Sequence, residues 1–271
     1  MTAKRSRKRK SLTDAPLCPC VRGAWRSAVW FVALLLFVPA AVLAGPPYVT
    51  DDPEPVKYQH WEVYLASQLS HDRDSWSGTA PHVEVNYGAL PNLQLHLIAP
   101  LAFVRPTHGG AQYGYADTEL GGKWRFIEEG SWQPQVGTFP LLELPTGNRE
   151  RNLGSGYVQA FLPLWLQKSL GPWTSYGGGG YWVNPGKGNR NWWFTGWQVQ
   201  YQLLPTVTPG VEIFHSTARE ESGAAATRFN VGVVLDFSDL HHLLFSVGRG
   251  LQGPNTTQVY LAYQLTYGLS P

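Results

Sequence analysis

A regular alternation of apolar and polar side chains in residues 257–267 constrains the fold more than any other feature. One parity is apolar: Val259, Leu261, Tyr263, Leu265 and Tyr267. The other parity, with Tyr260 as an exception, is polar or small: Gln258, Ala262, Gln264 and Thr266. Because successive side chains of a β-strand point to opposite faces, the segment predicts a strand with one apolar and one polar face.

The same alternation recurs along the chain between turn residues. We predict twelve strands, at residues 58–70, 79–89, 92–104, 115–127, 132–144, 157–168, 173–183, 192–203, 206–217, 227–237, 241–249 and 257–267. No segment shows the apolar stripe of an amphipathic helix, which recurs about every 3.6 residues. The fold class predicted from this pattern is all-β.

The connections between these strands alternate in length. Tight ones such as residues 90–91 and 204–205 are separated by long ones such as 145–156 and 184–191. Barrels of the bacterial outer membrane have short periplasmic turns, longer external loops and an even number of strands. We therefore predict an antiparallel, up-and-down transmembrane β-barrel at residues 58–267, with outer-membrane lipid against its apolar face and both termini in the periplasm.

The first 44 residues have the composition of an export signal. Basic residues come first, residues 28–43 are apolar, and Val42 and Ala44 are the small residues before a cleavage site at Gly45. The apolar run is short for a membrane helix, which needs roughly 20 residues. We expect residues 1–44 to be a cleaved signal peptide, and translation from Val21 would give a signal of ordinary length.

Removal of the leader reverses the sign of the net charge. The chain has 21 Lys and Arg against 19 Asp and Glu, and the leader contains eight of these bases and one acid, so 13 bases and 18 acids remain. The resulting charge of −5 gives no argument for nucleic-acid binding. Both cysteines, Cys18 and Cys20, lie in the leader, which excludes disulfides, thiol catalysis and cysteine metal sites in the mature chain.

Residues 45–57, the lead-in, are acidic and contain four prolines, which prevent regular strand pairing. We interpret the lead-in as a periplasmic tail, and the alternative is a plug folded into the mouth of the barrel. The strand predicted at 115–127 descends toward the periplasm, so Lys123 and Arg125 lie at that end. As a plug, the lead-in would pair these cations with three acids: Asp51, Asp52 and Glu54.

The polar parity of the predicted strands carries the charged residues expected in the lumen. They are Glu62, Glu84, Glu119, Lys123, Arg125, Glu143, Glu212, Arg228 and Asp236. Because buried charges need partners, these groups either fill the lumen with hydrogen bonds or line a solute path. Side chains fill a barrel of roughly 8 strands, and a water channel opens at roughly 16. For twelve strands we expect partial filling with a narrow path.

Aromatic residues gather near the ends of the predicted strands. The periplasmic group is Trp61, Tyr87, Phe126, Trp132, Trp173, Tyr201 and Tyr267. The external group is Phe103, Trp182, Trp192, Trp193 and Phe229. Amphipathic rings form girdles at headgroup depth, so we place both groups on the lipid side. Proline cannot donate to a ladder, so we expect bulges or breaks at four positions: Pro100, Pro140, Pro163 and Pro209.

Signals for metal binding and catalysis are weak. His60, His82 and His96 share the lumen parity, but a rise of roughly 3.4 Å per residue keeps His82 away from the other two. His215 and Ser216 are adjacent on a strand, so they point to opposite faces and do not form the base and nucleophile of a barrel phospholipase. We expect no metal, no cofactor and no enzymatic activity.

Residues 177–180 are four consecutive glycines. They lack the Lys and the Ser or Thr of a phosphate-binding loop. Small residues on a strand more often admit a bulky neighbour, here Trp165 or Tyr181, or kink the wall.

Several blocks carry a resemblance to known proteins. They are residues 46–55 (PPYVTDDPEP), 58–68 (YQHWEVYLASQ), 137–147 (GTFPLLELPTG), 165–182 and 241–245. In these blocks the chain resembles a family of proteobacterial outer-membrane transporters named after the meta-pathway of phenol degradation. The resemblance implies a barrel through which small molecules cross the outer membrane, and it supplies no binding residues. The long leader and the tail at 268–271 depart from the family pattern, and the tail weakens Tyr267 as a signal to the barrel assembly machinery.

We therefore predict an outer-membrane channel for passive passage of small, aromatic or apolar solutes. Lumen polar groups and the loop at 145–156, with Arg149, Glu150 and Arg151, would set its selectivity. The expected partners are lipid, the barrel assembly machinery and a small solute. The alternative is a structural or interaction barrel that transports nothing.

Overall fold

The computed structural model describes residues 46–268, and the structural statements below concern that range. The strands are β1 (His60–His71), β2 (Ser75–Leu90), β3 (Leu93–Pro106), β4 (Gln112–Tyr115), β5 (Thr118–Ile127), β6 (Gln135–Thr138), β7 (Leu141–Leu144), β8 (Gln159–Leu170), β9 (Trp173–Val183), β10 (Trp192–Tyr201), β11 (Val207–Ser216), β12 (Ala226–Asp236), β13 (His241–Gln252) and β14 (Thr257–Gly268). A short 3-10 helix, η2, spans Arg149–Arg151. Within this range no helix has the length and apolar character required to cross a membrane.

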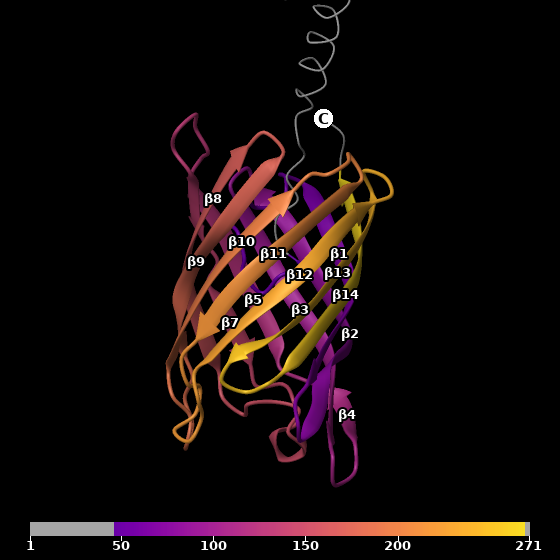
Figure 1. Cartoon of the computed structure of the whole chain (residues 1–271), viewed down its shortest axis with the longest axis vertical. Coiled ribbons are helices and arrows are strands. Elements are labelled where there is room, and N and C mark those ends of the chain that lie inside the picture. Colours follow the sequence, from indigo (N-terminus) through magenta and orange to yellow (C-terminus); the bar gives the residue numbers. More distant parts are fainter. Residues whose placement is uncertain (1–45, 269–271) are drawn as a thin grey trace, which may run out of the picture. The chain divides into compact units, whose positions relative to one another are not determined.

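These segments form a closed antiparallel barrel of twelve strands, as the sequence predicted (Figure 1). β4 and β5 both pair with β3, and β6 and β7 each pair with both β5 and β8. β4 with β5, and β6 with β7, therefore each form one interrupted barrel strand. The barrel closes where β1 pairs with β14, from His60 opposite Gly268 to His71 opposite Thr257. We call the end with His60 and Gly268 the terminus end, and the opposite end the loop end.

Two of the expected prolines mark the interruptions. Pro100 on β3 lies opposite the gap between β4 and β5, where its carbonyl accepts a hydrogen bond from the Ala116 backbone at 3.0 Å. Pro163 on β8 lies opposite the gap between β6 and β7, which contains Pro140. Because proline has no N–H to donate, the ladder stops where these residues face their neighbours. At Pro209 the register of β11 with β12 continues unbroken, whereas the ladder of β11 with β10 ends at Gly210, so the expected break lies on the β10 side.

Several connections at the loop end are shorter than the sequence suggested. The stretch at 71–78 is mostly strand, because β2 begins at Ser75 and leaves only residues 72–74 as a turn. The stretch at 250–256 is likewise reduced to residues 253–256. The hairpins therefore extend into regions whose Ser, Gly and Asp content had indicated loops. The long connections that remain are 145–158, 184–191 and 217–225.

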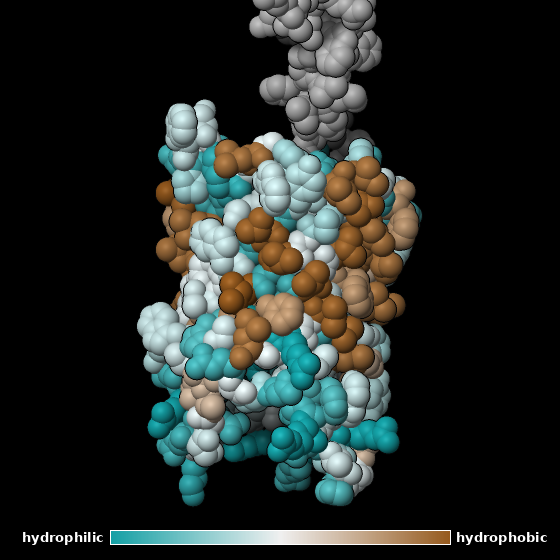
Figure 2. Space-filling model, viewed as in Figure 1, coloured by the Kyte–Doolittle hydropathy of each residue, from teal (hydrophilic) through white to brown (hydrophobic). Residues whose placement is uncertain are grey.

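The apolar and polar parities separate as predicted. On β14, Leu261 and Tyr263 are 48% and 42% exposed on the outside, whereas Ala262 and Gln264 are 1% and 2% exposed inside. Figure 2 shows brown, hydrophobic side chains over the upper and middle part of the visible face and teal ones toward the loop end. An apolar exterior of this size is typical of a protein surface that is not in contact with water.

Aromatic rings lie together on the outside at the terminus end. The rings of Trp61 and Tyr87 are 4.3 Å apart between centroids, and Trp61 also stacks with Tyr267 at 6.4 Å. Trp173 and Tyr201 are 4.6 Å apart. These contacts join rings that the sequence had grouped by their position at strand ends.

The four glycines on β9 make room for bulky side chains from both sides. A Cβ on Gly180 would lie 2.6 Å from the Phe161 ring, and a Cβ on Gly178 would lie 3.0 Å from Trp165. Gly177 similarly faces Trp197, 2.5 Å from the position of a Cβ. The expected neighbour Trp165 is thus confirmed, and Phe161 and Trp197 are two further neighbours.

Candidate functional site

The lead-in lies inside the barrel. Thr50 and Asp52 are 0% exposed, and Pro53 and Val56 are also buried. The interpretation of this segment as a tail outside the barrel is therefore wrong. The prediction rested on composition, and a segment rich in proline and acidic residues is normally found in solvent.

Ion pairs fix the lead-in to the wall. Lys123 Nζ on β5 lies 2.9 Å from Asp51 Oδ1 and 3.4 Å from Asp52 Oδ2. Arg125 Nη1 lies 2.7 Å from Glu54 Oε1, and Gln135 donates to the other Glu54 oxygen at 2.6 Å. Lys123 and Asp52 are almost completely buried. Such buried ion pairs hold the lead-in in one position, because separating or removing one partner leaves an uncompensated charge in the interior.

Wall side chains also satisfy the lead-in backbone. Glu212 on β11 accepts from the Val49 N–H at 2.9 Å and the Thr50 N–H at 2.8 Å. Gln94 accepts from the Val56 N–H at 2.9 Å, and Ser246 donates to the Pro47 carbonyl at 2.6 Å. A proline-rich segment forms no ladder of its own, so its buried N–H groups need acceptors of this kind. The glutamate expected in the lumen at 212 is an anchor for the lead-in.

Three other predicted lumen acids have wall partners. Glu62 accepts from the Tyr64 hydroxyl at 2.7 Å, and Glu84 accepts from Asn86 at 2.8 Å. Asp236 lies 2.6 Å from His242 Nδ1 at the terminus end. These contacts form a hydrogen-bonded filling of the wall, in line with one of the two roles considered for these residues.

The remaining predicted lumen residues face the loop end. Glu119 lies 2.9 Å from His96 Nε2, and it is opposite Glu143 in the register of β5 with β7. Glu143 and Arg228 have no ion-pair partner within 4.0 Å among residues 46–268. The Arg228 Nε–H is buried without an acceptor in that range. The predicted site residues therefore belong to three separate groups rather than to one cluster.

Within the described part of the chain, the lumen contains an outer and an inner cavity, beside a smaller space of about 200 Å³ near Tyr48 and Tyr260. The outer cavity, of about 760 Å³, lies toward the loop end and is lined by residues of β5, β7 to β10 and the long loops. The inner cavity, of about 610 Å³, lies toward the terminus end and is lined by the lead-in and by β1, β2 and β5. Asp51 and Phe139 line both cavities, so the two spaces meet at these residues. The Lys123 ammonium lies between them, bonded to Asp51 and 5.1 Å from the Phe139 ring centroid.

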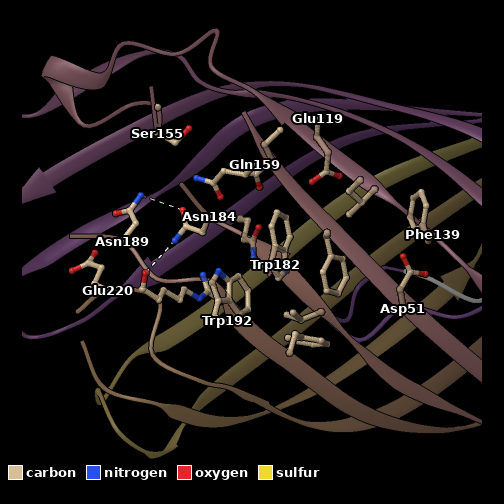
Figure 3. Close-up of a pocket in the computed structure, with 18 of the residues that line it drawn as sticks. Asp51, Glu119, Phe139, Ser155, Gln159, Trp182, Asn184, Asn189, Trp192 and Glu220 are labelled. Carbon is tan, nitrogen blue, oxygen red and sulfur yellow. Dashed lines mark hydrogen bonds between the residues drawn. The ribbon is translucent and has the colours of Figure 1, made fainter. Parts of the chain in front are cut away.

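One wall of the outer cavity is aromatic. Trp182 stacks with Phe161 at 4.8 Å and with Trp192 at 5.3 Å, with ring planes 12° and 8° apart. The cluster also contains buried Phe139, Trp165, Phe194 and Phe214. Figure 3 shows Trp182 and Trp192 beside each other, with Glu220 and Asn189 toward one end of the cavity and Phe139 and Asp51 toward the other.

The sequence missed this wall. Trp182 and Trp192 had been placed in the external lipid-side girdle, and the structure places them in the lumen. The signal that identifies their side is register: Trp192 and Phe194 share the parity of Gln198 and Gln200, which are buried in the lumen. Trp193, in contrast, is 60% exposed on the outside, as expected.

Arg219 caps the aromatic stack. Its guanidinium carbon lies 4.0 Å from the Trp192 ring centroid. Its carbonyl accepts from the Arg190 N–H at 2.9 Å and from Asn184 at 3.1 Å, which joins the loop at 217–225 to the loop at 184–191. Burial, and after it the nearby charge of Arg228, lower the Arg219 pKa to about 10, while Glu143 opposes the change.

The loop at 145–158 has two distinct parts. Asp117 accepts from the Gly147 N–H at 2.9 Å and the Ser155 N–H at 2.6 Å, which ties both ends of the loop together. Arg149 stacks on Tyr157 at 4.8 Å and lines the outer cavity. Arg151 instead bonds to Gln112 at 2.8 Å and to the Tyr113 carbonyl at 3.0 Å. Of the three loop charges considered for selectivity, only Arg149 lines the cavity, while Glu150 is exposed.

No group of three or more His, Cys, Asp or Glu side chains that could hold a metal ion occurs in residues 46–268. His96 binds Glu119 and Asn86, and His82 bonds to Thr79 at 2.7 Å. These histidines are occupied by wall contacts.

No model of a protein family and no curated protein matches this chain. Among solved structures, an outer membrane channel from Pseudomonas putida F1 matches with a TM-score of 0.69 and 17% identity, over 83% of this chain and 100% of that one. The fold is that of outer-membrane β-barrels. The NanC porin matches with a TM-score of 0.53 and 6% identity, over 75% of this chain and 98% of that one. The KdgM porin matches with a TM-score of 0.52 and 10% identity, over 75% and 99%.

Proposed function

We propose that this chain is an outer-membrane channel for the passive passage of small aromatic or apolar solutes. The observation that carries the proposal is the pair of cavities, which approach from opposite ends of the barrel and share Asp51 and Phe139. The apolar exterior and the likeness to outer-membrane channels and porins support the membrane location. In this location the leader ending near Ala44 is removed, and the terminus end faces the periplasm.

The aromatic wall supports the solute class. Phe161, Trp182 and Trp192 present stacked rings to the outer cavity, and ring faces favour flat aromatic solutes. Polar and charged side chains line much of the rest of the cavity, so the aromatic wall is the part of the lining that suits an apolar ring. The blocks at 46–55 and 137–147 support membership of the transporter family named after the meta-pathway of phenol degradation.

The lead-in sets the width of the path. Because Asp51 is held by Lys123 at the junction of the cavities, solute passes beside this ion pair or waits for it to open. The polar lumen residues then divide into two roles. Glu119 and Glu143 border the outer cavity and Glu62 and Glu84 border the inner one, while Glu212 supports the lead-in and Asp236 supports the wall.

The test measures passage directly. Mature protein is placed in liposomes and in planar bilayers, and swelling rates are compared for benzyl alcohol and for arabinose, a polar solute without an aromatic ring. We expect small single-channel conductance and faster swelling with benzyl alcohol than in protein-free liposomes, and slow swelling with arabinose. No openings and no protein-dependent swelling would contradict the proposal.

A barrel that transports nothing is the second candidate. It is favoured by the burial of the lead-in, which crosses the lumen between the cavities. The same experiment separates the two candidates. A lipase assay on the same purified material tests the expectation that the barrel is not an enzyme, and activity above that of an empty-vector preparation would overturn it.

A further inference from the structure

Two guanidinium groups lie near each other at the loop end without an acidic partner. No carboxylate oxygen of residues 46–268 lies within 4.0 Å of a nitrogen of Arg219 or Arg228. The Arg228 Nε–H is buried and has no hydrogen-bond acceptor in that range. Two neighbouring cations of this kind repel each other, and an anion between or beside them would relieve the repulsion.

The position of Arg219 is set by the fold. Three hydrogen bonds tie residues 219–221 to the neighbouring loop, two to the Arg219 carbonyl and one from the Glu221 N–H to the Gly188 carbonyl at 2.8 Å. The guanidinium carbon lies 4.0 Å from the centroid of the Trp192 ring, which covers one side of the group, and no carboxylate of residues 46–268 pairs with its nitrogens. A planar guanidinium fixed in this way is suited to the two oxygens of a carboxylate.

The lining acids do not neutralise this region. Asp51 and Glu119 line the same cavity, but Lys123 and His96 already bind them. Glu220 and Glu143 have no ion-pair partner within 4.0 Å among residues 46–268, and Arg149 lines the cavity together with Arg219. Glu143 attracts Arg219 from more than ion-pair distance, so it competes with a bound anion and weakens the site without filling it.

We propose that Arg219, supported by Arg228, binds the carboxylate of a small aromatic acid whose ring lies against Trp182 and Phe161 in the outer cavity. The cavity of about 760 Å³ is large enough for one such molecule, since ligand pockets commonly measure roughly 300 to 1,000 Å³. This inference rests on the proposed passage of small aromatic solutes and narrows it to anionic ones. An aromatic acid that enters from the loop end would first bind at this outer site and would then be slowed at the inner junction beside Asp51.

The test is binding to purified full-length mature protein in detergent, followed by tryptophan fluorescence. Trp192 lies directly under Arg219, so a ligand beside the guanidinium changes its emission. The probes are benzoate, benzyl alcohol and benzylamine, which share the ring and differ in charge. We expect benzoate to bind about 10-fold more tightly than benzyl alcohol, as a charged hydrogen bond permits, and benzylamine to bind most weakly.

Variants assign the effect to the two arginines. Arg219→Gln should remove the preference for benzoate while leaving benzyl alcohol binding within about 2-fold, and Arg228→Gln should weaken benzoate binding by a smaller factor. Glu143→Gln should strengthen it. Arg190→Gln is the matched control, because Arg190 is an exposed residue of the neighbouring loop outside the cavity lining.

Two results would overturn the inference. One is equal benzoate affinity in Arg219→Gln and Arg190→Gln, provided that both variants show the heat-modified gel shift of a folded barrel. The other is tighter binding of benzylamine than of benzoate, which would mean that Glu143 and Glu220 dominate the cavity. Because binding in detergent needs no transport, normal binding with no liposome swelling would count against the channel and not against this site.

Discussion

Lys123 and Asp51 lie 72 positions apart in the chain, and their charged groups meet at 2.9 Å where the two lumen cavities join. Lys123 is 4% exposed and also reaches Asp52, which is completely buried. This pair therefore links the position of the lead-in to the width of any path through the barrel.

Replacing Lys123 with Gln should loosen the lead-in. Asp51 and Asp52 would lose their cation in a buried setting, so we expect a loss of stability of about 3 kcal/mol and a rise in single-channel conductance. Thermal unfolding in detergent and bilayer recordings measure the two effects. Lys168→Gln is the control, because Lys168 forms a 2.9 Å pair with Glu129 at a partly exposed strand end, where we expect less than about 1 kcal/mol. Equal effects of both variants would disprove the special role of Lys123.

Replacing Glu212 with Gln should release the start of the lead-in. The carboxylate accepts from two backbone N–H groups, at Val49 and Thr50, and the amide has only one oxygen with which to replace it. The local free energy of opening should fall by about 1 to 3 kcal/mol, because one buried donor is left unsatisfied. Hydrogen exchange of the peptide covering residues 46–53 should become faster.

The matched control for that experiment is Asp236→Asn. Asp236 is also a lumen-parity acid with a side-chain partner, and within residues 46–268 that ion-pair partner is His242 of the wall and not a residue of the lead-in. Its replacement should leave exchange of residues 46–53 unchanged. If Glu212→Gln and Asp236→Asn accelerate hydrogen exchange of residues 46–53 equally, the cause is a change in the whole barrel and not the loss of the hydrogen bonds to Glu212.

Gly180→Ala tests the close packing of β9 against β8. A Cβ there would lie 2.6 Å from both the Phe161 ring and the Pro163 Cα, and the latter is backbone that cannot move aside cheaply. We expect a loss of about 1 to 3 kcal/mol, as for other overpacked sites, measured by the temperature of the gel shift. Gly122→Ala on β5 is the control, because its nearest contact would be an ordinary 3.7 Å. An unchanged Gly180→Ala protein would show that β8 and β9 are not held at this spacing.

The sequence predicted the barrel well because its signal is local. Alternation of parity depends only on neighbouring residues, and twelve repeats of it leave few other folds. It also placed Lys123 and Arg125 at the end where the lead-in acids meet them, since strand direction follows from counting hairpins. The interpretation of the lead-in as an outside tail is wrong because composition measures average polarity, whereas Thr50 and Asp52 are buried by specific partners.

Predicting the aromatic wall requires knowing the register of each strand, that is, which of its side chains point inward. The sequence defines this register only loosely at strand ends. A shift of one residue moves every side chain of a strand to the other face. Trp192 and Trp193 are adjacent, so one of them had to face inward, yet both had been assigned to the outside. Arg219 could not be found from a pattern at all, because a loop has no parity and only the bonds to residues 184–190 bring it over Trp192.

Acid should open the tip of the first hairpin. Asp72 accepts from the Asp74 N–H at 2.8 Å and the Ser75 N–H at 2.7 Å, and these bonds lower the Asp72 pKa below its ordinary value. A carboxyl group with a depressed folded pKa contributes stability that is present above the unfolded pKa, about 3.9, and is lost as pH falls through the folded pKa. NMR signals of the Asp74 and Ser75 amides should therefore stay protected at pH 5 and lose protection below about pH 4. Asp72→Asn should show weaker protection without this pH dependence, whereas Asp74→Asn, which changes a neighbouring carboxyl that accepts neither bond, should keep it. Because these hydrogen bonds join Asp72 to Asp74 and Ser75 within one turn, an acid transition that instead follows unfolding of the whole barrel would disprove a local cause.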